Sequence, residues 1–140
     1  MAINLSSTKL LDEKGLLKTN QRKEILNIMS LEDKPLTAKH IYNKLKDRNP
    51  HLKLSTIYRN LNIFAEKDIV RKLNIRNDSN ENLFELIIKD HHHHLVCMKC
   101  GEIKDIKCLL DDYLKEIEDN NNYLIKDHRL TVYGLCEDCR

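Results

Sequence analysis

Two Cys-x-x-Cys pairs constrain the fold of this chain more than any other feature. They are Cys97 with Cys100 and Cys136 with Cys139, and 35 residues separate them. Four thiolates in this arrangement match the tetrahedral coordination of a structural Zn²⁺. A thioredoxin-like redox site needs only one such motif, and two structural disulfides are the remaining alternative. The spacing therefore predicts a fold that structural zinc stabilises, with Gly101 permitting the tight turn after the first pair.

Four consecutive histidines, residues 91–94, lie upstream of the first pair. If this run forms a β-strand, His92 and His94 point to one face, and His91 and His93 to the other. One run can then contribute to two metal sites. Nearby donors that could complete these sites are Glu85, Asp105, Asp112 and His128. Mixed nitrogen and oxygen donors suit Fe²⁺, Mn²⁺ or Zn²⁺. A solvated polar stretch is the alternative, whereas an expression tag does not fit an internal run.

The composition favours an intracellular globular protein. Hydrophobic residues make up 41% of the 140 positions, no apolar run could span a membrane, and the N-terminus lacks a signal-peptide pattern. Four of the five cysteines form pairs, which favours metal binding in a reducing cytoplasm. Cys108 is left over, as an inert thiol or a redox-active residue. The chain shows no nucleophile–base arrangement, so we expect no catalysis.

The two halves of the chain carry opposite charge. Residues 1–73 contain 15 Lys and Arg against 8 Asp and Glu, a net charge of +7. Residues 74–140 contain 9 against 14, a net charge of −5. A basic half joined to an acidic half rich in His and Cys indicates nucleic-acid binding joined to metal binding, although ordinary solvated charge is the alternative. His40 and His51 stand alone in the basic half and are predicted to be surface residues.

Short amphipathic helices fill the first half of the chain. Hydrophobic spacing and caps predict helices from Ser7 to Gly15, from Thr19 or Asn20 onward, over 37–47 and over 55–67, then strands over 69–75 and 83–88 joined by a turn at 77–82. This order predicts a winged helix-turn-helix domain over residues 1–88. Helix 37–47 would cross the DNA backbone, and helix 55–67 would enter the major groove.

The second half is predicted to be a small α/β domain over residues 92–140, with a hinge at 89–91. Its elements are strands at 92–96 and 102–106, a helix through Leu110 and Ile117 that ends at 120–122, and a final pair of strands at 123–125 and 130–135. The fold class is therefore α+β, with two domains.

The helix over 55–67 carries side chains suited to reading DNA. Its apolar positions face the core and leave four polar residues near its exposed N-terminal part: Ser55, Thr56, Tyr58 and Arg59. Hydroxyl groups can contact phosphates, Arg59 can reach a guanine edge, and Tyr58 can pack on a thymine methyl. Lys18 and Arg22 are candidate phosphate contacts. An amphipathic helix with an exposed arginine is common, so the pattern alone is not specific.

Together, three segments resemble the ferric uptake regulator (Fur) family. They are Ser55-Thr56-Ile57-Tyr58-Arg59-Asn60-Leu61, the histidine run with Leu95-Val96-Cys97-x-x-Cys100-Gly101, and Asp127-His128-Arg129-Leu130 leading to Gly134-x-Cys136-x-x-Cys139. The resemblance extends from about Leu16 to Cys139. It implies a cytoplasmic, homodimeric, metal-dependent repressor in which metal at the hinge sets the separation of two winged-helix domains on a palindromic operator.

The resemblance also implies roles for individual residues. Cys97, Cys100, Cys136 and Cys139 match structural zinc ligands; Glu85, His92, His94 and Asp105 match the regulatory site; His91, His93, Asp112 and His128 match an additional site; and Tyr58 and Arg59 match base-contacting positions. Pro35 stands where the family often has a histidine, so the regulatory site would close with fewer protein ligands, a water or a neighbouring residue.

The leading hypothesis is a repressor of metal-uptake genes that responds to Fe²⁺. The alternatives are a zinc-uptake regulator, a peroxide-stress regulator and a zinc protein that does not bind DNA. The peroxide-sensing branch typically has two aspartates where this chain has Glu85 and Asp105, and the zinc-uptake branch often has a hinge cysteine that this chain lacks.

Overall fold

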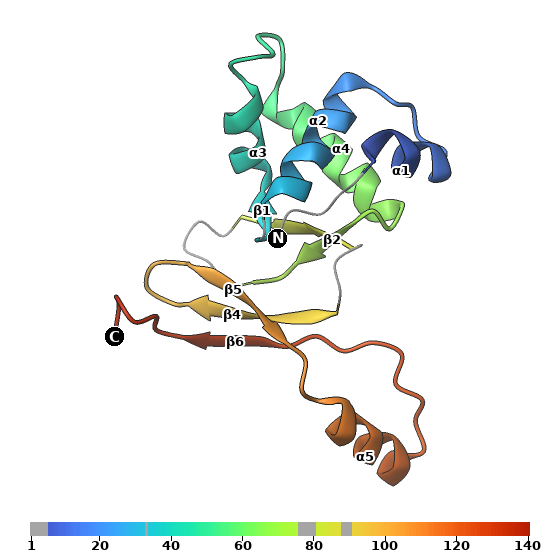
Figure 1. The fold of residues 1–140 in the computed structure, drawn as a ribbon, viewed down its shortest axis with the longest axis vertical. Helices are drawn as coiled ribbons and strands as arrows, with labels where there is room; N and C mark the ends of the chain where they lie inside the picture. Colours follow the sequence, from blue (N-terminus) through green and yellow to red (C-terminus); the bar gives the residue numbers. More distant parts are fainter. Residues whose placement is uncertain (1–5, 33, 76–80, 88–90) are drawn as a thin grey trace. The chain divides into compact units, whose positions relative to one another are not determined.

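A computed structural model describes residues 6–32, 34–75, 81–87 and 91–140 (Figure 1). The chain divides into two compact units, Met1–Lys89 and Asp90–Arg140. Both units combine helices and strands, so the chain has the predicted α+β class. The proposed hinge at 89–91 and the turn at 77–82 fall largely outside the described residues and stay predictions.

The first unit begins with four helices: α1 (Ser7–Glu13), α2 (Asn20–Leu31), α3 (Ala38–Leu45) and α4 (Leu54–Glu66). Side-chain oxygens of Ser6, Thr19 and Thr37 accept backbone N–H bonds at the starts of α1, α2 and α3. The cap of α1 is thus one residue earlier than predicted. Helix α4 also begins earlier, at Leu54, and its cap residue Lys53 makes no side-chain capping bond.

A small antiparallel sheet completes this unit. Its strand order is β1 (Leu36–Thr37), β3 (Leu83–Leu86), β2 (Val70–Leu73), and β1 is a short strand that the sequence pattern did not reveal. The helices gather over this sheet in Figure 1. The apolar faces of the helices and of the sheet form one buried core that includes Leu26, Ile41, Ile57, Leu61, Phe64 and Phe84. Helix α4 is therefore anchored along its apolar face.

The second unit is a three-stranded sheet with one helix. Its elements are β4 (His92–Cys97), β5 (Ile103–Lys107), α5 (Asp111–Asn121) and β6 (Thr131–Gly134). β4 is the central strand, antiparallel to β5 and parallel to β6. Helix α5 ends where predicted, because Asn122 adopts the left-handed conformation at φ 55°.

One predicted strand does not form. Residues 123–125 are not part of the sheet, because β6 pairs with the central strand β4 instead. The segment is held to α5 by the N–H of Ile125, which donates to Glu118 Oε1 at 2.6 Å. The pairing of β6 with β4 matters for function, because it carries the second cysteine pair alongside the first.

This unit has very little core of its own. Among its described residues, Val96 and Cys97 are the buried hydrophobic side chains. Exposed large apolar side chains are instead numerous: Leu95, Met98, Leu109, Tyr113, Tyr123, Leu124, Leu130, Val132 and Leu135. Within the described residues of the whole chain, no helix is both long and apolar enough to cross a membrane.

Candidate metal centres and nucleic-acid interface

The four paired cysteines converge at one end of the second unit's sheet. Cys97 closes β4, and its register with Gly134 on β6 brings Cys136 and Cys139 to the same place. The four sulfur atoms lie within 4.8 Å of one another, and the Sγ atoms of Cys100 and Cys136 are 3.8 Å apart. Tetrahedral zinc with Zn–S bonds of about 2.3 Å requires sulfur separations of about 3.8 Å. The donor set therefore fits zinc.

The electrostatics of this group also fit a cation. Backbone N–H groups of Cys100 and Cys136 lower the pKa of Cys97 to about 6. Hydrogen bonding to the Cys136 thiol, together with burial, raises the pKa of Cys139 to about 12. The thiolate of Cys97 is thus stabilised by backbone N–H groups, whereas its neighbouring thiol and burial disfavour ionisation of Cys139. A bound Zn²⁺ would replace the remaining thiol protons and neutralise the thiolates.

The histidine run splits between the two faces of β4, as the alternation of a strand requires. The imidazoles of His92 and His94 lie 4.9 Å apart between ring centroids. Asp105 on β5 is directly opposite His94 in the register, and its Oδ1 lies 3.7 Å from His92 Nε2 and 3.6 Å from His94 Nε2. These three predicted ligands form a nitrogen and oxygen donor set suited to Fe²⁺ or Mn²⁺.

The other two histidines meet a different set of partners. His128 Nε2 lies 3.0 Å from His91 Nε2, 3.1 Å from His93 Nε2 and 3.2 Å from Cys108 Sγ. Burial, followed by the charges of the neighbouring histidines, lowers the pKa of His93, which favours the neutral imidazole that can ligate metal. Asp112, expected from the sequence, is exposed in the first turn of α5 and does not belong to this group.

The remaining predicted ligand, Glu85, lies in the first unit. It is on the central strand β3, its side chain is buried, and its Oε1 lies 3.8 Å from Arg71 Nη1. Pro35 is buried just before β1. Of the isolated histidines, His51 is exposed, and His40 Nε2 lies 2.8 Å from Glu32 Oε1 in a partly exposed pair.

The proposed DNA-reading residues lie at the start of α4. Ser55 and Arg59 are exposed, Thr56 is half-buried, and Tyr58 is partly buried because its ring packs against the core. Lys18 is exposed and pairs with Asp12 at 3.5 Å. This end of the helix therefore presents hydroxyl, aromatic and guanidinium groups from a fixed backbone.

Arg22 has a structural partner that the sequence did not reveal. Its Nε donates to Asn60 Oδ1 at 3.1 Å, and its Nη1 donates to the carbonyl of Leu17 at 3.2 Å. Asn60 is buried on α4 and its amide donates to the carbonyl of Thr56. Arg22 thus joins α2 to α4. In the sequence, this network is indicated only by Asn60, a polar residue on the apolar face of the helix over 55–67.

Comparison with known proteins places the chain in a family. Residues 13–133 match the model of the ferric uptake regulator family. The chain belongs to the ferric uptake regulator family. The ferric uptake regulation protein of Bacillus subtilis (strain 168) is 36% identical over 124 residues, covering 86% of this chain and 83% of that protein.

Solved structures agree with this membership. The crystal structure of the Vibrio cholerae ferric uptake regulator has a TM-score of 0.81 at 32% identity, covering 94% of this chain and 100% of that one. A peroxide stress regulator from Campylobacter jejuni has a TM-score of 0.73 at 26% identity, covering 96% and 100%. The first comparison supports the predicted winged-helix domain followed by a small α/β domain.

Membership of the Fur family fixes the broad function. The chain is a metal-responsive transcription regulator and not an enzyme, as the sequence predicted. Its second unit carries cysteine and histidine groups that could hold metal ions. The sequence did not indicate that Cys108 is a candidate metal ligand beside His91, His93 and His128. Its position directly after a strand that pairs with the histidine strand could have indicated this.

Proposed function

We propose that this Fur-family chain is a homodimeric repressor of metal-uptake genes that binds palindromic operators when Fe²⁺ is present. The observation that carries the proposal is the presence of two chemically different donor sets in one unit. Four thiolates at one end of the sheet suit permanent Zn²⁺, whereas His92, His94 and Asp105 suit an exchangeable metal. A permanent ion and an exchangeable ion are what a sensor needs.

The composition of the second donor set supports iron as the regulatory metal. Two imidazoles and one carboxylate are the donor set found in proteins that hold non-haem Fe²⁺ with open coordination positions. His94 is buried, and Asp105, a predicted oxygen ligand, is held opposite it by strand register. The set contains no thiolate, which would favour Zn²⁺ or Cu⁺. Mn²⁺ and Zn²⁺ remain competitors for the same donors.

The proposed regulatory site also includes Glu85, which the family resemblance assigns to it. Its carboxylate would join ligands of the second unit to the first, so that metal affinity becomes a preference for one arrangement of the two units. Because Pro35 cannot ligate, a water or a neighbouring residue would complete the coordination. The coupling is limited by the difference in metal affinity between the DNA-competent arrangement and the others.

The DNA-binding surface is proposed to centre on the start of α4. Arg59 and Tyr58 would contact bases, Ser55 and Thr56 would contact phosphates, and Lys18 would add a phosphate contact from the α1–α2 connection. Arg22, which was also predicted to contact phosphate, is proposed to act mainly by fixing α4 through Asn60. The +7 charge of residues 1–73 favours approach to the DNA backbone.

The homodimer is proposed to form through the second unit. Leu95 and Val132 are register neighbours on β4 and β6, and both are exposed. Tyr123 and Leu124, which follow α5, are 74% and 69% exposed. Exposed apolar side chains of this kind on a unit with so small a core favour burial against another protein surface. A second copy would bury these side chains and place two α4 helices on the two halves of a palindrome.

The proposal is tested by measuring operator affinity at fixed salt in titrations with Fe²⁺, Mn²⁺ and Zn²⁺ under anaerobic conditions. The operator is first obtained by selection from random duplexes with each metal. We expect Fe²⁺ to increase the affinity for a palindromic duplex and His92→Ala with His94→Ala to abolish that increase. The double variant should keep its zinc and remain a dimer, because the cysteines lie at the far end of the sheet.

His91→Ala with His93→Ala is the matched control from the opposite face of the same strand. It should perturb metal-activated operator binding much less. Equal loss in both double variants would contradict the assignment of the regulatory metal to His92 and His94. Activation by Zn²⁺ alone would instead identify a zinc-uptake regulator, and loss of operator binding when peroxide is added to the Fe²⁺ form would identify a peroxide-stress regulator.

A further inference from the structure

The group formed by His91, His93, His128 and Cys108 has a geometry that hydrogen bonding does not explain. His128 Nε2 lies within 3.0 to 3.2 Å of three other donor atoms, two imidazole nitrogens and one sulfur. An imidazole nitrogen carries either one proton or one lone pair, so it can satisfy one such partner well. Hydrogen bonds among these four side chains therefore cannot account for all three short contacts to His128.

We infer that these four residues form a Cys-His₃ site for Zn²⁺, in which Cys108 and not Asp112 is the fourth ligand. All four donor atoms lie within 4.8 Å of one another. Tetrahedral zinc, with bonds of about 2.0–2.3 Å, separates nitrogen and sulfur donors by about 3.3–3.6 Å. The three distances to His128 are a few tenths of an ångström shorter, so a small outward shift of the His128 imidazole brings them to the tetrahedral separation.

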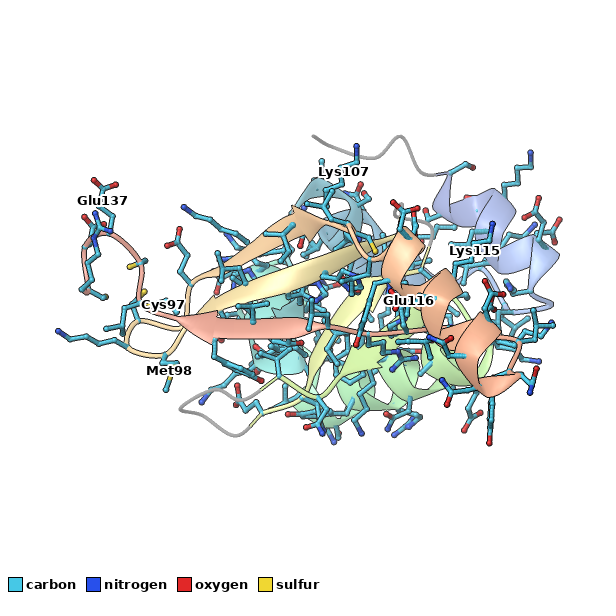
Figure 2. The ribbon with its side chains drawn as sticks, turned by 90° about the horizontal axis from the view of Figure 1, so that it is seen from below. Cys97, Met98, Lys107, Lys115, Glu116 and Glu137 are labelled. Atoms are coloured by element: carbon cyan, nitrogen blue, oxygen red, sulfur yellow. The ribbon has the colours of Figure 1, made fainter. Side chains whose placement is uncertain are left out.

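The backbone explains why the thiol takes this position. Cys108 is the first residue after β5, whose Lys107 is opposite His92 at the start of β4. Strand pairing therefore places the sulfur of Cys108 at the histidine end of the sheet. Asp112 comes four residues later, where the chain has already turned into α5 and its side chain is exposed. Figure 2 shows Lys107 and Cys97 at different ends of the sheet, so this site is separate from the four-cysteine site.

The site is also accessible to an ion. His91, Cys108 and His128 line a surface hollow of about 690 Å³, which carboxylates of Asp111, Glu118 and Asp127 border. His93, by contrast, is buried beneath it. One thiolate with three imidazoles is a donor set that zinc binds in tetrahedral sites and that disfavours the octahedral oxygen coordination of Mn²⁺. The inference goes beyond the proposed iron response and requires no DNA binding.

Co²⁺ tests the inference, because a thiolate ligand gives it a sulfur-to-metal charge-transfer band and tetrahedral coordination gives intense visible bands. Reduced protein with zinc retained in the four-cysteine site receives one equivalent of Co²⁺ anaerobically, and retention of the original zinc is measured in the same sample. We expect the wild type and Asp112→Ala to develop both signals. Cys108→Ser should lose the charge-transfer band and bind Zn²⁺ at least about tenfold more weakly.

Cys108→His is the control variant, because it replaces the thiolate with another side chain that can bind Zn²⁺. It should retain tetrahedral visible bands and tight binding but lack the charge-transfer band, which separates loss of a ligand from loss of the fold. An undiminished band in Cys108→Ser would overturn the inference, as would loss of binding in Asp112→Ala with none in Cys108→Ser. DNA is absent from these measurements, so failure here is distinguishable from failure of the proposed repressor function.

Discussion

The two units of this protein are stabilised by different means. In the first unit, four helices and a sheet bury a continuous core, with Leu26, Ile41, Ile57, Leu61 and Phe64 fully inaccessible. In the second unit, many large apolar side chains stay exposed, and the buried positions include the histidines His93 and His94. The first unit therefore depends on hydrophobic burial, whereas the second depends on ligands and, as proposed, on a second copy of itself.

This difference suits a sensor. A unit with a complete core presents α4 to DNA in one conformation, whatever the metal supply. A unit whose stability depends on bound ions responds to that supply, because binding free energy and folding free energy are the same quantity there. Substitutions in the first unit should therefore change sequence-specific DNA contacts, and substitutions in the second unit should change the dependence on metal.

The largest effect is expected from Cys136→Ser. Structural zinc contributes apparent binding free energies of about 10–16 kcal/mol in zinc-finger peptides, far more than the small core of the second unit can replace. We expect this variant to lose zinc, dimerisation and the slow amide exchange of residues 92–140, while amides of α2–α4 stay protected. Hydrogen exchange measured by mass spectrometry resolves the two units in the intact chain.

Cys108→Ser is the matched control for that change, since it also removes a thiol from the second unit but leaves the four-cysteine site complete. It should keep the zinc of that site and the protection of the residues beside it, at the Cys97 end of β4 and the Gly134 end of β6. If Cys136→Ser remained a zinc-free dimer with unchanged protection, the second unit would be stabilised by packing and the contrast between the units would be wrong.

The next largest effect is expected from Leu61→Ala in the first unit. Leu61 is fully buried, and truncating such a leucine costs about 2–5 kcal/mol through lost burial and the remaining cavity. The loss should appear in the unfolding free energy of the first unit, measured by urea denaturation. Zinc content should not change. A parallel loss of zinc or dimer would show that the two units unfold as one.

The sequence predicted the features that depend on local patterns. The cap at Thr19, one of the two candidates that the sequence offered, the helical spacing of Ile57 and Leu61, and the pairing of cysteines all follow from short-range chemistry. The sequence did not predict features that depend on which distant segment a residue contacts. The 123–125 segment forms no strand because β6 pairs with β4, and neither the Cys108–His128 contact nor the Arg22–Asn60 bond has a local signature.

Arg59→Ala should have a smaller effect, confined to specific DNA binding. Arg59 is exposed, so its loss should leave stability and metal content unchanged. If it makes the proposed bidentate contact with guanine, specific affinity falls by about 1–3 kcal/mol for each half-site, and random duplexes are bound nearly as before. Fluorescence anisotropy with operator and random duplexes at one salt concentration measures both.

Arg22→Ala provides the contrast within the same unit. It would leave the buried oxygen of Asn60 without its donor, at a cost of about 1–3 kcal/mol in the unfolding free energy. Its effect on DNA should therefore follow the loss of stability and not the identity of the bases. Equal weakening of operator and random DNA by Arg59→Ala would reduce Arg59 to a phosphate contact.

The smallest effect is expected from Lys18→Ala, and it separates charge from specificity within the first unit. The pair that Lys18 makes with Asp12 is exposed on both sides, so its removal should hardly change stability. A phosphate contact contributes equally to every sequence, and each one lost reduces the slope of log affinity against log salt by about 0.9, or about 1.8 for a dimer. Titrating operator and random duplexes across a range of salt measures this slope. An unchanged slope would mean that Lys18 stays with Asp12 and lies outside the DNA interface, whereas a loss restricted to the operator would make it a specificity residue.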